Sequence, residues 1–238
     1  METDKRMTND ANGARTTHHA SRITPVDPTI ALSYAARGRA LLIAGKDEAA
    51  LEAFERAAWL APDEPRVQWA LANTLWRLDR GADAVAVYER VIELAPNEAA
   101  PRCNLAELLA VLGRVADARV QIAAARALAS GDPHLHFAEA VVSLAQRRPP
   151  AAEESAREAV ASVILPKFAY LDLGHALLAQ GRAAEALIAY RTARQHCAAE
   201  DLRTARQDLR WLASVYSSLV PTAYAEALAI FAPEANRG

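Results

Sequence analysis

The feature of this chain that most constrains its fold is a set of small residues that recurs every 34 positions. One such track consists of Ala50, Ala84, Ala118, Ala152 and Ala186. A second track of very small residues consists of Gly38, Ala72, Ala106, Ala140 and Gly174. A third, mostly large track consists of Phe54, Tyr88, Ile122, Ala156 and Tyr190. Several tracks in one register over five cycles indicate an internal repeat.

Within each cycle, the apolar residues follow the period of an amphipathic helix. Leu51, Phe54 and Ala58 lie three and four residues apart and therefore share one helical face. Small residues allow two helices to cross closely, and an aromatic side chain fills the adjacent space. Glycine between the two helices suits a left-handed turn. One helix pair would leave an apolar face exposed, so the pairs are expected to stack.

The spacing resembles the tetratricopeptide repeat, whose pattern contains A-x3-F and a closing proline. The best matches are Ala50-x3-Phe54 with Pro62 and Ala84-x3-Tyr88 with Pro96. The resemblance covers about residues 31–198 and implies an all-α, right-handed solenoid of antiparallel helix pairs. The five expected repeats are 31–64, 65–98, 99–132, 133–166 and 167–200.

The ends of the chain differ from the repeats. Residues 1–27 are polar and charge-mixed, which predicts a disordered N-terminal tail. Residues 200–238 are out of register and are expected to form two C-terminal capping helices and a short tail, with a dimer seam as the alternative. The predicted helices are 29–44, 47–60, 65–79, 82–94, 99–112, 116–129, 133–146, 150–164, 167–180, 183–198, 200–219 and 222–232.

Charge and composition argue against several classes of function. The 27 basic and 29 acidic residues give a net charge of −2, which predicts no nucleic-acid partner. A basic group near the C-terminal helices is diluted by acidic neighbours and is expected to be ordinary surface; it comprises Arg191, Arg194, Arg203, Arg206 and Arg210. No run of apolar residues is long enough for a membrane span, and no signal peptide is recognisable, so a cytoplasmic location is expected.

No pattern in the sequence predicts catalysis, a cofactor or a metal site. The phosphate-binding, dinucleotide-binding and nucleophile-elbow motifs are absent. His134 and His136 lie two residues apart on an expected helix and diverge, so they make a poor pair of metal ligands. His196 and Cys197 are adjacent and diverge in the same way. We therefore predict a protein that is not an enzyme.

In the family that the sequence resembles, the first helix of each pair lines a concave groove in which ligands bind. The resemblance implies groove-facing candidates at Arg39, Arg66, Trp69, Asn73, Trp76, Arg77, Asn104, Glu107, His134, Phe137, Phe168, Leu171 and His175. The alternative, in which Trp69 and Trp76 pack between repeats as core, stays open.

Chaperone-binding members of the family hold a carboxylate with a clamp of lysine, asparagine and arginine. Asn73 and Asn104 match its asparagines, but Trp69 replaces the lysine, and His134 and Ala138 occupy the remaining basic places. An apolar or aromatic segment is the better expectation. The predicted function is a non-enzymatic adaptor that binds a peptide or helix of another protein. The alternatives are a homo-oligomer formed through residues 200–232 and an assembly or regulatory subunit of a larger enzyme complex.

Overall fold

The computed structural model describes residues 28–162, 166–199 and 201–232, and the regular structure in these ranges is entirely α-helical. The predicted disordered tail, residues 1–27, lies outside the described residues. The helices are α1 (Pro28–Ile43), α2 (Asp47–Leu60), α3 (Pro65–Arg77), α4 (Gly81–Leu94), α5 (Ala100–Val111), α6 (Val115–Leu128), α7 (Pro133–Ala145), α8 (Pro149–Ala161), α9 (Pro166–Ala179), α10 (Ala183–His196), α11 (Asp201–Val215) and α12 (Pro221–Ile230).

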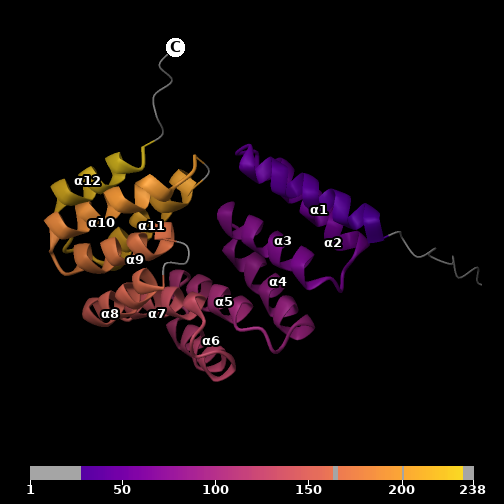
Figure 1. Ribbon diagram of the computed structural model, residues 1–238, viewed down its shortest axis with the longest axis horizontal. Coiled ribbons are helices and arrows are strands. Elements are labelled where there is room, and N and C mark those ends of the chain that lie inside the picture. Colours follow the sequence, from indigo (N-terminus) through magenta and orange to yellow (C-terminus); the bar gives the residue numbers. More distant parts are fainter. Residues whose placement is uncertain (1–27, 163–165, 200, 233–238) are drawn as a thin grey trace, which may run out of the picture.

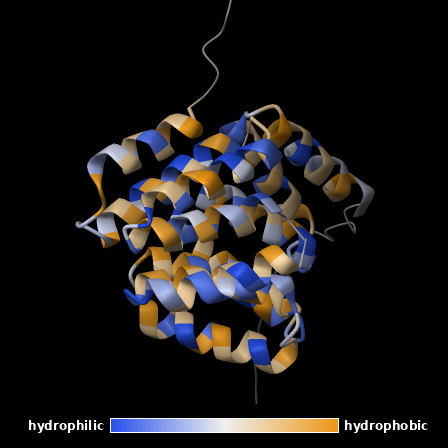
Figure 2. Cartoon of the chain, turned by 60° about the vertical axis from the view of Figure 1, so that its left-hand side comes forward, coloured by the Kyte–Doolittle hydropathy of each residue, from blue (hydrophilic) through white to orange (hydrophobic). Residues whose placement is uncertain are grey.

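Helices α1 to α10 form five pairs that stack in chain order. Each odd-numbered helix packs against the even-numbered helix that follows it, and each pair also contacts the next. Figure 1 shows the resulting arc, from α1 in indigo to α10 in orange. Hydrophobic and hydrophilic residues alternate along the helices (Figure 2), as expected where one face of each helix is buried. The predicted architecture of stacked helix pairs is confirmed. None of the described helices is long and apolar enough to cross a membrane.

The repeated small residues lie where the two helices of a pair cross. Ala50, like its four counterparts along the chain, is fully buried. A Cβ atom added to Gly174 would lie 2.4 Å from Cε1 of Tyr190, and one added to Gly38 would lie 2.7 Å from Cζ of Phe54. The aromatic ring therefore occupies the space that a missing side chain leaves, as the sequence predicts.

The turn inside each pair uses one residue with a left-handed backbone. Three of these residues are glycines, and Gly113 has φ of 78°. Asp79 and Arg147 adopt the same conformation, with φ of 59° and 57°, although they carry side chains. In the first turn, the backbone N–H of Lys46 donates to the carbonyl of Leu41 at 2.9 Å, which satisfies a carbonyl at the helix end.

Two C-terminal helices, α11 and α12, follow the five repeats, as predicted. Helix α12 packs on α10 and covers the end of the stack, whereas α11 lies on the inner side against α7 and α9. Leu209 and Leu212 of α11 are fully buried. Just beyond α11, the hydroxyl of Tyr216 donates to the carbonyl of Leu144 at 2.9 Å. The two helices of this pair therefore pack differently: α12 lies over the last repeat helix, and the apolar face of α11 packs inside the arc.

Polar contacts also join α11 to the beginning of the arc. Arg203 donates to the carboxylate of Asp47 in α2 at 3.1 Å, across 156 positions of sequence. Gln207 donates to Asp79, in the turn after α3, at 2.8 Å. The last helices thus meet the first ones, and the inner side of the arc is enclosed.

Candidate functional site

A cavity of about 540 Å³ lies on the inner side of the arc. Its floor comes from the first helices of four pairs, α3, α5, α7 and α9, and α11 forms the opposite wall. Because the repeats place equivalent helices side by side, their inward-facing residues converge on one space. The volume falls within the range of ligand-binding cavities.

Most of the predicted groove residues line this cavity. They are Trp69, Asn73, Trp76, Arg77, Asn104, Glu107, His134, Phe137, Phe168, Leu171 and His175. Arg39 and Arg66 do not line it, and both are exposed. Phe137, Leu171 and His175 are only 3–5% exposed, so they form walls rather than open surface. That these residues bind a partner stays a prediction.

One wall of the cavity consists of residues that were not predicted from the sequence. Thr204, Gln207, Asp208 and Trp211 of α11 line it together with Asp172 of α9. The α11 residues were missed because the segment is out of register with the repeats and was assigned to a cap. The signal available was its marked amphipathic pattern, which places Asp208 and Trp211 three residues apart on one face.

The two tryptophans of α3 serve both core and cavity. Trp69 and Trp76 are half-buried and pack against the N-terminal hydrophobic core, and both line the cavity. The indole N–H of Trp69 is buried and has no hydrogen-bond partner among the described residues. The rings therefore add apolar area to the cavity wall, while this N–H is buried.

Two amides lie between the tryptophans and the acidic part of the cavity. The hydroxyl of Tyr88, behind the cavity floor, donates a short hydrogen bond to Oδ1 of Asn73. The side-chain amide of Asn104 donates to the same oxygen at 3.4 Å. This network fixes the Asn73 side chain, which leaves its own N–H groups to other partners.

Basic side chains at the rim of the cavity are paired with acids. Arg77 contacts Asp47 at 3.0 Å, and Lys167 contacts Asp201 at 2.6 Å. Asp47 is nearly inaccessible and also receives Arg203, so it holds α2, α3 and α11 together. These contacts engage three basic side chains at the rim, Arg77, Arg203 and Lys167, with two carboxylates.

Three carboxyl groups inside the cavity have raised pKa values. Burial raises the pKa of Glu107 well above its usual value, and nearby Asp172 and Asp208 raise it further. Burial also raises the pKa of Asp208 to about 7, with Asp172 adding to the effect and His175 opposing it. The pKa of Asp172 is raised by burial, although nearby His175 opposes the shift.

Neither Glu107 nor Asp208 has an ion pair or a side-chain hydrogen bond among the described residues. Asp172 faces Nδ1 of His175 at 3.9 Å. His175 is 3% exposed, and its Nε2 atom has no hydrogen-bond partner within the described part of the chain. The cavity therefore contains an excess of hydrogen-bond acceptors and of potential negative charge.

Two of the histidines that the sequence singles out, His134 and His136, contact acidic side chains. His134 pairs with Asp132 at 2.9 Å, and His136 contacts Glu158 at 3.0 Å. Burial raises the pKa of the Cys197 thiol, which disfavours the nucleophilic thiolate. Within the described ranges, no group of three or more His, Cys, Asp or Glu side chains is placed to hold a metal ion.

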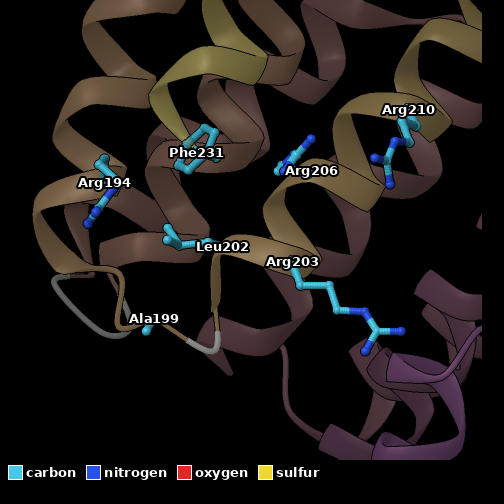
Figure 3. A pocket seen from close by; sticks show the side chains of 7 residues that line it. All are labelled: Arg194, Ala199, Leu202, Arg203, Arg206, Arg210 and Phe231. Carbon is cyan, nitrogen blue, oxygen red and sulfur yellow. The ribbon is translucent and has the colours of Figure 1, made fainter. Parts of the chain in front are cut away.

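Arginines line a second pocket on the opposite side of α11. Arg203, Arg206 and Arg210 of α11 meet Arg194 of α10 there, beside Phe231 (Figure 3). Arg203 extends away from the others, toward the N-terminal helices and Asp47. Four of the five arginines that the sequence groups together therefore do line one pocket.

Comparisons with known proteins agree with this architecture. Models of the tetratricopeptide repeat match residues 65–108, 103–167 and 137–201. No curated protein matches the chain. A thermophilic tetratricopeptide-repeat protein of Thermus thermophilus is 23% identical with a TM-score of 0.64, over 84% of this chain and 99% of that one.

Two further solved structures share the fold at lower identity. The structure of the APC/C hetero-tetramer Cut9–Hcn1 matches at 18% identity and a TM-score of 0.64, over 85% of this chain and 43% of that one, so this chain spans under half of its length. PilW, a type IV pilus biogenesis factor, matches at 15% identity and a TM-score of 0.57, over 83% and 90%. Because the family models together span more than half of the sequence, the chain belongs to the tetratricopeptide-repeat family.

Proposed function

We propose that this protein is a non-enzymatic adaptor that binds a segment of another protein in the cavity between its first helices and α11. The observation that carries the proposal is the convergence of Trp69, Trp76 and Trp211 on one enclosed space. Aromatic rings supply contact area at a small cost in conformational entropy. The stacked helices also hold the wall in place before binding, which lowers the cost of association.

The structure offers a way to separate binding from stability. Trp69 and Trp76 pack partly against the core, so truncation to alanine would also remove stabilising contacts. Leucine keeps an apolar side chain against the core and removes the aromatic ring from the cavity. We expect a Trp69→Leu/Trp76→Leu double variant to lose most partner capture in an affinity pull-down from native lysate, with little change in melting temperature.

Trp59→Leu is the matched control. Trp59 is 67% exposed on α2 and does not line the cavity. This variant should capture the same proteins as the unmodified chain. Equal capture by the unmodified chain and the cavity double variant would contradict the proposed site, because the interaction would then lie elsewhere on the surface.

Self-assembly through residues 200–232 remains the alternative function, and the packing of α11 and α12 argues against it. Leu209, Leu212 and Phe231 are fully buried within the chain itself, so they are not available for a second copy. Light scattering should therefore give the mass of one chain at micromolar concentration. A dimeric mass would favour self-assembly. Deleting residues 200–238 is not a suitable test, since it would uncover the core beneath these side chains.

A further inference from the structure

We propose that the cavity accepts a basic side chain, arginine or lysine, from the partner segment and holds it between Glu107, Asp172 and Asp208. The inference rests on the proposed function and specifies the chemistry of the partner. It differs from a carboxylate clamp, because the charge that the wall presents is negative.

The first argument is the charge inside the cavity. The three carboxyl groups come from three different helices, α5, α9 and α11, and face one space. Each lies in a partly or largely buried position, where an unpaired negative charge is unfavourable. The basic groups at the rim do not balance them, because Arg77 pairs with Asp47 and Lys167 with Asp201. A cation placed among the three would offset their mutual repulsion.

The second argument is independent of the carboxylates. His175 is 3% exposed, lines the cavity and has no hydrogen-bond partner at Nε2 among the described residues. In the neutral tautomer that carries its proton on Nδ1, 3.9 Å from the Asp172 carboxylate, Nε2 carries a lone pair and accepts a hydrogen bond. A guanidinium or ammonium group has only donors to offer, so it satisfies this acceptor and the carboxylates together.

The third argument concerns the rest of the ligand. The aliphatic stem of arginine or lysine packs well on aromatic rings, and the cation is attracted to their faces. Trp76 and Trp211 are cavity-lining rings from opposite walls, on α3 and α11. Asn73 and Asn104 line the same cavity, and their side-chain amides are suited to hydrogen bonds with a peptide backbone. We therefore assign the site to a basic side chain within a peptide rather than to a small cationic molecule.

A peptide-display selection on the whole chain tests the inference. A random twelve-residue library is selected against the unmodified protein and against a Glu107→Gln/Asp208→Asn variant. We expect enrichment of arginine and lysine with the unmodified protein and loss of this preference with the variant. A selected peptide whose basic residue is replaced by norleucine should then bind about tenfold more weakly, measured by the change in tryptophan fluorescence.

A Glu89→Gln/Glu226→Gln variant is the control, since it removes the same number of negative charges from exposed positions on α4 and α12. It should keep the basic preference. Peptides that depend on Trp69 and Trp76 but show no basic preference would overturn this inference and leave the proposed function standing. Absence of any enriched peptide would overturn both. Free arginine amide that binds as tightly as the selected peptide would overturn the assignment to a peptide.

Discussion

The two sides of α11 carry opposite charges in very different surroundings. Arg206 and Arg210 line the outer pocket, and Arg210 is exposed to solvent (Figure 3). Asp208 and Trp211 face the enclosed cavity on the other side. Water screens the exposed Arg210, so its charge affects stability little. The enclosed carboxyl group lacks this screening, and its pKa rises to about 7. Enclosure, rather than the number of charges, distinguishes the two sides as candidate sites.

The largest expected effect compares neighbouring residues of α11. Leu209 is fully buried, whereas Arg210 is exposed. Leu209→Ala should lower the free energy of unfolding by about 2–5 kcal/mol, because it leaves a cavity beneath the helix. Arg210→Ala should change it by less than about 0.5 kcal/mol. Urea unfolding followed by circular dichroism measures both. Equal values would show that α11 is not anchored by its apolar face.

The repeats, rather than α11, are what the sequence predicts well. The small residues and the aromatic residues recur at the same interval because they make the same contact in successive repeats. Their packing can therefore be predicted from their spacing alone. Arg147 stands 34 residues after Gly113, in the turn of the fourth pair, and it adopts the same left-handed backbone. Ala156 takes the place of the aromatic residue and is fully buried, consistent with closer packing of that pair.

Only the part of the cavity wall that the repeat helices form could be predicted from the sequence. The residues of α3, α5, α7 and α9 could be found because successive cycles place them equivalently. The position of α11 depends on contacts such as Arg203 with Asp47, which join residues 156 positions apart and leave no periodic signal. Asp208 consequently appeared in the sequence as one acid that dilutes a basic surface, although it faces the cavity.

The second prediction tests the enclosed carboxyl group through the pH dependence of stability. The pKa of Asp208 is about 7 in the folded chain and about 3.9 in an unfolded one. Between these values the folded state binds more protons, so stability falls as pH rises from about 4 to about 7. Asp208→Asn removes the carboxyl group and with it this fall in stability. The variant should gain stability relative to the unmodified chain across that window, measured by urea unfolding at several pH values.

The difference between the two proteins reports Asp208 together with Glu107 and Asp172, to which it is electrostatically coupled, and removes the contribution of groups outside the cavity. Glu153 behaves in the opposite sense: burial raises its pKa, but hydrogen bonds from Gln180, Arg157 and Arg182 outweigh this and lower it to about 2. The stability that the Glu153 carboxylate contributes is lost as pH falls from about 4.5 to about 2. The loss is the same in both proteins, so it cancels in the difference between their free energies of unfolding. Arg206→Gln, on the outer side of α11, should leave the pH profile unchanged. A flat difference curve for Asp208→Asn would mean that its carboxyl group is solvated.

The smallest expected effect on stability comes from removing the hydroxyl group of one of two equivalent tyrosines. Tyr88 and Tyr190 occupy the same repeat position and are both fully buried. The hydroxyl of Tyr88 donates to Asn73, whereas that of Tyr190 has no partner among the described residues. Tyr88→Phe should therefore destabilise the fold by about 1 kcal/mol, because it removes a buried hydrogen bond.

Tyr190→Phe should be neutral or slightly stabilising, since it removes an unsatisfied buried hydroxyl and keeps the ring contacts with His175 and Phe231. Thermal unfolding of the two variants side by side measures the contrast. A loss for Tyr190→Phe as large as that for Tyr88→Phe would show that the Tyr190 hydroxyl is satisfied by water from the cavity. The acidic end would then be hydrated, and a basic side chain would have to displace that water to bind, which would weaken its affinity.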